Sequence, residues 1–145
     1  MGKFKYKFEN IHRIKKTIEK KVQREVAEIE LEIDKRKAEV KRLLEEKHLK
    51  KMELKNKKCL KVSELQFHEQ FFISLDKKIE LLNDDIVKLK NNKEIKLKEL
   101  VEKSKETKMF EKLEEKHFER FQKEEVKSEQ IEMDDIATKK FVRSK

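Results

Sequence analysis

The chain has 145 residues, of which 49% are charged and 35% hydrophobic, with one glycine, no proline and no tryptophan. Compact globular domains carry only about a quarter charged residues and build their turns with glycine and proline, so this composition excludes an ordinary globule. The 40 basic and 31 acidic residues are intermixed, and helix formers dominate, which favours long helices over disorder.

The charge is distributed unevenly along the chain. Residues 1–61 hold 21 basic and 11 acidic residues, whereas residues 62–145 hold 19 and 20. Such charge usually forms solvated helix faces, although a basic surface also favours anionic partners, nucleic acid among them. Cys59 is the single cysteine, so no intrachain disulfide is expected and a reducing cytosol fits. We expect neither a signal peptide nor a membrane span, because no stretch has the required apolar length.

The first half of the chain carries one apolar stripe, which predicts a helix over about residues 4–56. Its members follow one another at steps of three and four with one gap of seven: Phe4, Phe8, Ile11, Ile14, Ile18, Val22, Val26, Ile29, Ile33, Val40 and Leu43.

A turn is predicted at about residues 56–62. Asn56 tolerates the left-handed conformation that often ends a helix. Ser63 and Gln66 form a capping-box pattern, which places the start of the second helix at Ser63.

The second half predicts a helix over about residues 63–138 with a clear heptad seam. That seam weakens through residues 90–96 and 102–108, then returns in part as far as Phe121. Its first eight positions, Leu65, His68, Phe72, Leu75, Ile79, Leu82, Ile86 and Leu89, include seven apolar residues.

The two halves together predict an all-α fold, a single elongated antiparallel coiled-coil hairpin over residues 1–145. In an antiparallel hairpin the numbers of two facing residues add up to a constant. A sum of 119 places five apolar pairs opposite one another: Val22 and Leu97, Ile18 and Val101, Ile33 and Ile86, Val40 and Ile79, and Leu44 and Leu75. The second helix then overhangs its partner beyond about residue 120. One continuous helix forming a parallel dimer is the alternative.

Catalytic chemistry is not indicated, and we expect no enzyme activity, catalytic residue, cofactor or metal. The only glycine, Gly2, cannot build a phosphate-binding loop. The histidines at 12, 48, 68 and 117 are too scattered for a local metal site. Cys59 is interpreted as a bystander, and His68 as a tolerated polar seam position rather than a pH-sensitive group.

Two features suggest binding surfaces. Phe67 and Phe71 lie four residues apart, off the seam, and either cover the turn or form an exposed anchor. The N-terminal run from Lys3 to Lys16 interleaves basic and aromatic residues, a pattern that suits nucleic acid. Core packing of Phe4, Phe8 and Ile11 explains those aromatics equally well, and no nucleic acid partner is expected.

Three segments resemble the FliJ family of flagellar export proteins over nearly the whole chain. They are the opening "FKYKFENIHRIKKTIEKKV", the second-helix start "FHEQFFISLDKKIELL", and the C-terminal block that begins "KMFEKLEEKHFERF". That block ends similarly to the family's closing "E-Q-x-E-x-D-E-x-A" at residues 129–137, with Asp135 in place of the usual glutamate.

The resemblance implies a non-enzymatic cytoplasmic component of type III export at the flagellar base, acting in flagellum biogenesis and motility. Family members are two-helix stalk-like rods that enter the hexameric ring of the export ATPase, contact the cytoplasmic domain of the export gate and, in some cases, escort export chaperones. Contact with the membrane is then expected only through these partners. Two other functions fit the residues: a stalk subunit of a rotary or virulence-secretion ATPase, and a basic coiled coil that binds nucleic acid.

The resemblance also suggests site residues. Phe71 and Leu75 match the gate-binding surface, while Lys78 and Leu82 occupy similar positions with different residue types, and the exposed-anchor hypothesis adds Phe67. The two chain ends, residues 3–22 and 100–137, match the part that enters the ATPase ring. The residues expected to contact the ring are Phe4, Phe8, Ile11, Phe118, Phe121, Ile131, Met133, Asp134 and Asp135.

Overall fold

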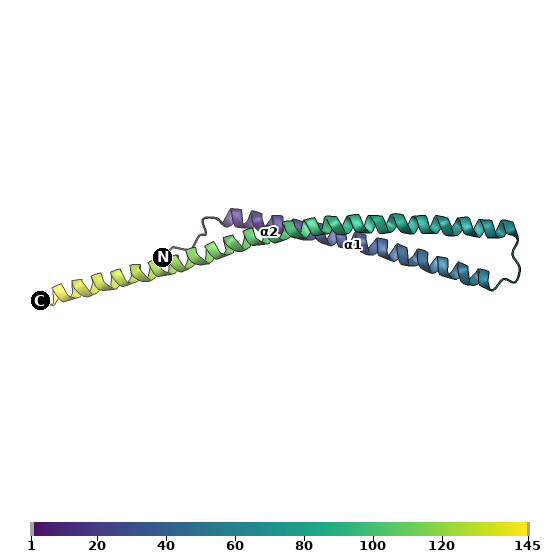
Figure 1. Ribbon diagram of the computed structural model, residues 1–145. Helices are drawn as coiled ribbons and strands as arrows, with labels where there is room; N and C mark the ends of the chain where they lie inside the picture. Colours follow the sequence, from purple (N-terminus) through teal and green to yellow (C-terminus); the bar gives the residue numbers. More distant parts are fainter. Residues whose placement is uncertain (1, 145) are drawn as a thin grey trace. The chain divides into compact units, whose positions relative to one another are not determined.

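A computed structural model describes residues 2–144 of the chain. Two helices make up almost all of it: α1, Glu9–Lys55, and α2, Val62–Arg143, joined by a turn (Figure 1). The chain reverses at residues 56–61, so the predicted antiparallel two-helix fold is confirmed and the single continuous helix is excluded. Within residues 2–144, no helix has the length and apolarity to cross a membrane.

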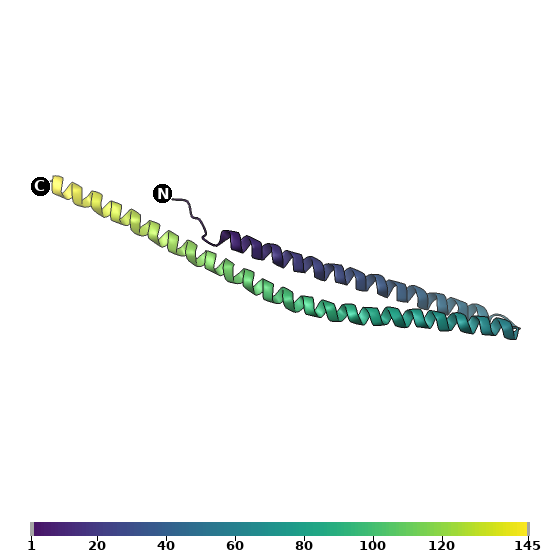
Figure 2. The same cartoon turned by 90° about the horizontal axis from the view of Figure 1, so that it is seen from above.

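The contacts between the helices fall into two units, and each is described by itself. The terminal unit combines residues 2–20 with residues 101–144. The turn unit, Lys21–Leu100, contains the rest of α1, the turn and the first half of α2. In both units a segment of α1 lies beside a segment of α2 that runs the opposite way (Figures 1 and 2).

Helix α1 begins later than the sequence predicts. Residues 4–8 are not helical: the Glu9 N–H donates to the Tyr6 carbonyl across a turn, and the His12 N–H donates to the Phe8 carbonyl at the start of the helix. A helix would stack Phe4 and Phe8 on one face, whereas the non-helical segment spreads its aromatic rings along α2. The end of α1 at Lys55 agrees with the prediction to within one residue.

The turn does not use the two capping devices that the sequence suggests. Among residues 2–144, no residue other than glycine has a positive φ, so Asn56 is not left-handed. Helix α2 begins at Val62, and the Lys61 carbonyl accepts the Leu65 N–H at 3.0 Å. Ser63 therefore lies inside the first helical turn, and the predicted capping box is wrong.

Buried and half-buried side chains in the turn unit recur at alternating steps of three and four along both helices, which is a heptad seam. The predicted seam from His68 to Leu89 is confirmed. It does not weaken afterwards, because Lys93 and Lys96 continue it. The α1 positions are Val22, Val26, Ile29, Ile33, Arg36, Val40, Leu43, Lys47, Lys50 and Leu54.

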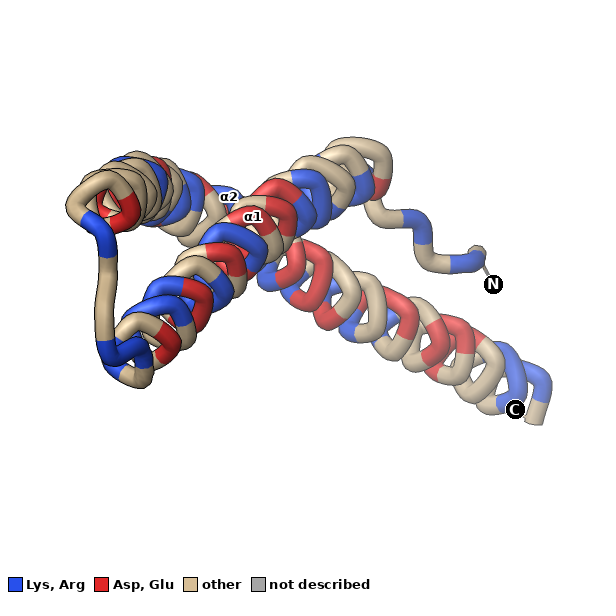
Figure 3. Tube along the Cα trace, turned by 90° about the vertical axis from the view of Figure 1, so that its right-hand side faces the viewer, with Lys and Arg blue, Asp and Glu red and all other residues tan. Residues whose placement is uncertain are grey.

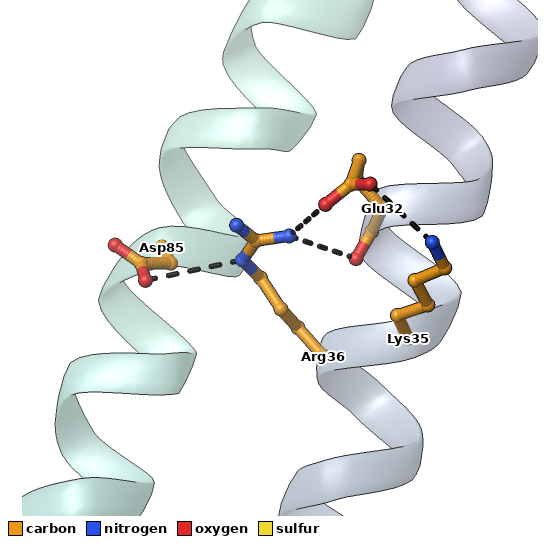
Figure 4. A network of polar contacts seen from close by, with 4 residues as sticks. All are labelled: Glu32, Lys35, Arg36 and Asp85. Carbon is orange, nitrogen blue, oxygen red and sulfur yellow. Dashed lines mark hydrogen bonds and ion pairs between the residues drawn. The ribbon is translucent and has the colours of Figure 1, made fainter.

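Basic residues at the seam reach across to acidic residues of the other helix. Figure 4 shows Arg36 of α1 directed toward Asp85 of α2, with Glu32 and Lys35 beside it. The nitrogen–oxygen distances of the five such pairs are 2.9 Å for Lys15–Glu106, 3.9 Å for Arg36–Asp85, 2.6 Å for Lys47–Asp76, 2.9 Å for Lys93–Glu30 and 2.7 Å for Lys96–Glu25. Lysine stems cover apolar surface in this way while the charged end stays at the edge.

These ion pairs define the register of the two helices. The residue numbers of each of the five pairs total 121 or 123. A seam register of 122 follows, which sets Val40 opposite Leu82 and Leu43 opposite Ile79. The predicted total of 119 is therefore wrong by about three residues, and Leu44, Leu97 and Val101, which it placed in the seam, are exposed. Matching apolar residues alone misses this register, because basic residues occupy part of the seam.

Candidate interaction surfaces

An aromatic cluster fixes the N-terminal segment on α2 in the terminal unit. Tyr6 is buried, and its hydroxyl donates to the Phe110 carbonyl at 2.9 Å. Its ring lies edge-on to the rings of Phe8 and His117, at centroid distances of 5.9 Å and 5.7 Å. Burial and, to a lesser extent, the Glu114 carboxylate raise the pKa of the Tyr6 hydroxyl above its usual value of 10.0. Tyr6 therefore stays protonated and can keep donating at neutral pH.

Phe4 extends the cluster toward the C-terminal end of α2. Its ring centroid lies 5.2 Å from that of Phe118 and 5.5 Å from that of Phe121. Four of the residues predicted to contact the ATPase ring, Phe4, Phe8, Phe118 and Phe121, thus pack on one another or on neighbouring aromatic rings. Much of their apolar surface is consequently used inside this protein.

His12 takes the seam position that the sequence assigned to Ile11. The His12 side chain is buried between two carboxylates of α2, with Nδ1 3.4 Å from Glu114 Oε2 and Nε2 3.9 Å from Glu111 Oε1. Ile11 and Ile14 are exposed instead. The reason is that the strict seven-residue period of the coil continues into this unit, through Lys15 and His12, and the isoleucines fall outside it.

The C-terminal part of α2 leaves the seam after Phe121. Val126, Met133 and Ile136 lie on one side of the helix at about 100° per residue, whereas Ile131 lies on the other. All four side chains are exposed, and Met133 has 72% of its surface accessible. The helix continues to Arg143, five residues beyond its predicted end.

Acidic residues accompany this exposed apolar surface. Next to Gly2 and Phe121, a shallow groove is lined by Ser128 and four glutamates: Glu124, Glu125, Glu129 and Glu132. Asp134 and Asp135 follow, both exposed, and the Asp134 carbonyl accepts the Thr138 hydroxyl at 2.8 Å within the helix. We call residues 122–137 the acidic end of α2.

The residues predicted to bind the gate are placed differently from one another. Phe67 is 67% exposed and Lys78 is exposed, whereas Phe71 and Leu82 are half-buried. Leu75 is only 4% exposed, because it occupies the seam. A partner protein can therefore reach Phe67, Lys78 and the outer part of Phe71, while Leu75 is buried in the seam.

Two ion pairs of the seam lower the pKa values of their carboxylates. Contact with the Lys96 ammonium lowers the pKa of Glu25 below its usual value, and the Lys15 ammonium does the same for Glu106. Lys96 also contacts Glu99, and both carboxylates raise the pKa of the Lys96 side chain. These groups are charged at neutral pH and act as fixed links between the helices.

Sequence reasoning missed Tyr6, His12 and the lysines of the seam. The seven-residue spacing from Leu89 through Lys96 to Lys103 is the signal in the sequence that marks the lysines as seam positions, and a pattern of apolar residues alone does not include it. In the part of the chain that the structure describes, no three histidine, cysteine or acidic side chains gather closely enough to hold a metal ion. Cys59 is exposed in the turn.

Comparison with known proteins identifies a family. A family model described as "Flagellar FliJ protein" matches residues 4–145. Searches of curated proteins and of solved structures found no match.

Proposed function

The chain belongs to the flagellar FliJ family, and we propose that it serves flagellar export by docking through two separate surfaces, one on the export ATPase ring and one on the export gate. The family is a non-enzymatic component of flagellar export. Our proposal adds the partners, a cytoplasmic location at the flagellar base, and the residues that make each contact.

The ATPase contact is assigned to the acidic end of α2, residues 122–137. This assignment rests on an exposed row of Val126, Met133 and Ile136, on a part of α2 that has no partner helix beside it within the terminal unit. Apolar side chains on an otherwise charged helix suit a helix-in-groove contact with another protein. The glutamates along the same stretch favour a basic partner surface.

The Phe4 cluster has a supporting part in this proposal. Its rings occupy the last packed positions before the acidic end, so it fixes where the free part of α2 begins. We assign Phe4, Phe8, Phe118 and Phe121 to this positioning role, although Phe118 keeps 42% of its surface exposed, and we assign the residues after them to contact.

The gate contact is assigned to the outer face of early α2. Phe67 supplies an exposed aromatic anchor, Phe71 a half-buried neighbour and Lys78 a charge. Exposed aromatic residues often provide much of the binding energy at protein interfaces. Leu75 and Leu82 belong to the layer beneath, where they pack against α1.

Stimulation of the purified export ATPase tests the first contact. A chain that stops after Lys123 keeps the rings of Phe4, Phe118 and Phe121 together but removes the exposed row. A chain that stops after Lys139 is the matched control. We expect the shorter chain to lose stimulation while keeping its helical circular dichroism, and the control to keep both. Full stimulation by the shorter chain would refute the assignment.

Pull-down by the isolated cytoplasmic domain of the gate tests the second contact. Phe67→Ser should weaken capture without changing ATPase stimulation. Val87→Ser, which alters another exposed apolar residue of α2 in the turn unit, should change neither. Equal capture of the Phe67 variant and the unaltered chain would remove Phe67 from the gate surface.

A further inference from the structure

The turn between α1 and α2 gathers more positive charge than its neighbouring acids, Glu53 and Glu64, carry in negative charge. Residues 50–61 contain six lysines and one acidic residue, Glu53. Lys50 pairs with Glu53 at 3.5 Å. The other five lysines are exposed and make no ion pair in the part of the chain described here: Lys51, Lys55, Lys57, Lys58 and Lys61. Figure 3 shows basic residues on the connection between the helices.

Exposed apolar side chains surround these lysines. Leu49 and Met52 lie in the last two turns of α1, and Val62 and Leu65 in the first turn of α2. Val62 is 72% exposed and Leu49 68%. Leu65 occupies the next seam position, but the residues opposite it belong to the turn, so half of its surface is exposed. We call these four residues and the five lysines without an ion pair the turn patch; Lys51 among them lies over the Phe72 ring, 5.9 Å from its centroid.

The turn patch lies at one end of the turn unit. At about 1.5 Å per residue, its helical members lie within roughly 10 Å of the helix ends. Such an end can approach a flat surface with its lysines and apolar side chains together. This arrangement differs from the seam, where five basic residues are paired with acids of the other helix.

We propose that the turn patch binds an anionic lipid surface directly. Lysines near an anionic leaflet each add attraction, and apolar side chains gain by entering the boundary between headgroups and acyl chains. Nucleic acid would use the lysines but would gain little from the aliphatic side chains of Leu49, Val62 and Leu65, because base recognition relies on stacking and hydrogen bonds. Charge complementarity and these aliphatic side chains together favour lipid.

A direct lipid contact goes beyond the proposed function and differs from one expectation drawn from the sequence. Contact with the membrane was expected only through partner proteins, whereas the turn patch supplies a contact of its own. Phe67 belongs to the proposed gate surface and is not part of the turn patch. The ATPase contact lies in the terminal unit, so the two activities can be altered separately.

Co-flotation of the full chain with vesicles tests the proposal. The vesicles contain phosphatidylcholine and phosphatidylglycerol at a ratio of about two to one, or phosphatidylcholine alone. We expect binding to the mixed vesicles only. It should weaken with added salt, because the Debye length is only about 8 Å at physiological ionic strength.

Charge reversal at the turn is compared with the same reversal elsewhere. The turn variant changes Lys55, Lys57, Lys58 and Lys61 to glutamate. The control variant makes the same change at four other exposed lysines without ion pairs, Lys88, Lys90, Lys98 and Lys105. Both lower the net charge from +9 to +1. At about fivefold for each lysine near the surface, the turn variant should bind at least about a hundredfold more weakly, and the control should lose far less.

A single tryptophan reports insertion directly, because the chain has none. Leu65→Trp should shift its emission to the blue on the mixed vesicles and be quenched by brominated acyl chains. Val87→Trp, at a similarly exposed position on the same helix, should show neither effect.

Several results would overturn the proposal. They are an absence of binding to the mixed vesicles, an equal loss in both charge variants, or an unshifted Leu65→Trp spectrum. Binding of the chain to a single-stranded oligonucleotide, lost in the turn variant while vesicles are not bound, would assign the patch to nucleic acid instead. ATPase stimulation by the turn variant in lipid-free solution should be unchanged, so a failure here is distinguishable from a failure of the proposed function.

Discussion

Cysteine cross-linking tests the register that the ion pairs define. In a chain carrying Cys59→Ser, one variant places cysteines at Val40 and Leu82, whose numbers total 122. A second variant places them at Val40 and Ile79, which total 119. All three positions are half-buried, so thiol access is matched between the two variants.

The expected difference follows from helix geometry. A shift of three residues moves a cysteine about 4.5 Å along the helix axis. A disulfide needs its Cα atoms within about 4.4–6.8 Å, and departures from that geometry store several kcal/mol of strain. Because about 1.4 kcal/mol corresponds to a factor of ten, we expect the pair at 40 and 82 to form a disulfide at least about tenfold more favourably.

The assay is oxidation in a glutathione redox buffer, followed by mass measurement and a non-reducing gel. The gel separates a bridge within one chain from a bridge between two chains. Preferential cross-linking of the pair at 40 and 79 would show that apolar matching sets the register and that the seam ion pairs do not. A product that joins two chains would contradict the hairpin itself.

Three further predictions concern stability and are measured by urea unfolding. Lys47→Glu and Asp76→Lys should each destabilise the turn unit, and the double variant should recover about 0.5 kcal/mol of coupling, as expected for a partly exposed ion pair; additive losses would mean that the pair contributes nothing. Tyr6→Phe should lower the free energy of unfolding by about 1 kcal/mol, because it removes a buried hydrogen bond to the Phe110 carbonyl. The same variant should speed proteolysis of the N-terminal segment. Unchanged cleavage would show that the hydroxyl does not fix that segment. Acid should destabilise the fold as the pH drops below about 4.5, because the pKa values of Glu25 and Glu106 are lowered in the folded chain and the unfolded chain therefore takes up protons first. The double variant Glu25→Gln with Glu106→Gln should flatten this pH dependence. An unchanged slope would assign the acid sensitivity to other carboxylates.

The sequence predicts the fold class and much of the seam for clear physical reasons. Turn formers are nearly absent, and helix formers with a seven-residue apolar period dominate. Such a chain can form long helices but can reverse direction only rarely, which predicts two long helices. The seam from His68 to Leu89 follows directly from that period. The sequence also resembles the FliJ family of flagellar export proteins, and the family match over residues 4–145 confirms this resemblance.

The register could not be predicted from apolar residues alone. Positions such as Lys93 and Lys96 look like interruptions until a partner acid is placed beside them, and the acid belongs to the other helix. Pairing therefore depends on both helices at once. The same limit explains Tyr6, whose burial depends on the Phe110 carbonyl 104 residues further along the chain.

Seam cations also have a consequence for the coil as a whole. Each lysine or arginine at a seam position gives up apolar burial, since only its stem is covered. In exchange, a shift of one helix along the other would separate the five paired seam cations from their acids on the opposite helix, so alternative registers lose several ion pairs together. Polar seam residues are known to select one register at some cost in stability. The turn unit thus holds one alignment without a large apolar core.

The two ends of α2 differ in chemistry, and this difference bears on how the protein selects partners. Residues 50–61, leading into its start, are basic, whereas Glu119 to Asp135 contain seven acidic and three basic residues. The apolar side chains near the turn lie among lysines, and those of the acidic end lie among carboxylates. An anionic surface is attracted to the first and repelled by the second, and a cationic surface the reverse. Charge alone therefore directs unlike partners to different segments of the chain, before any detailed fit between surfaces is made.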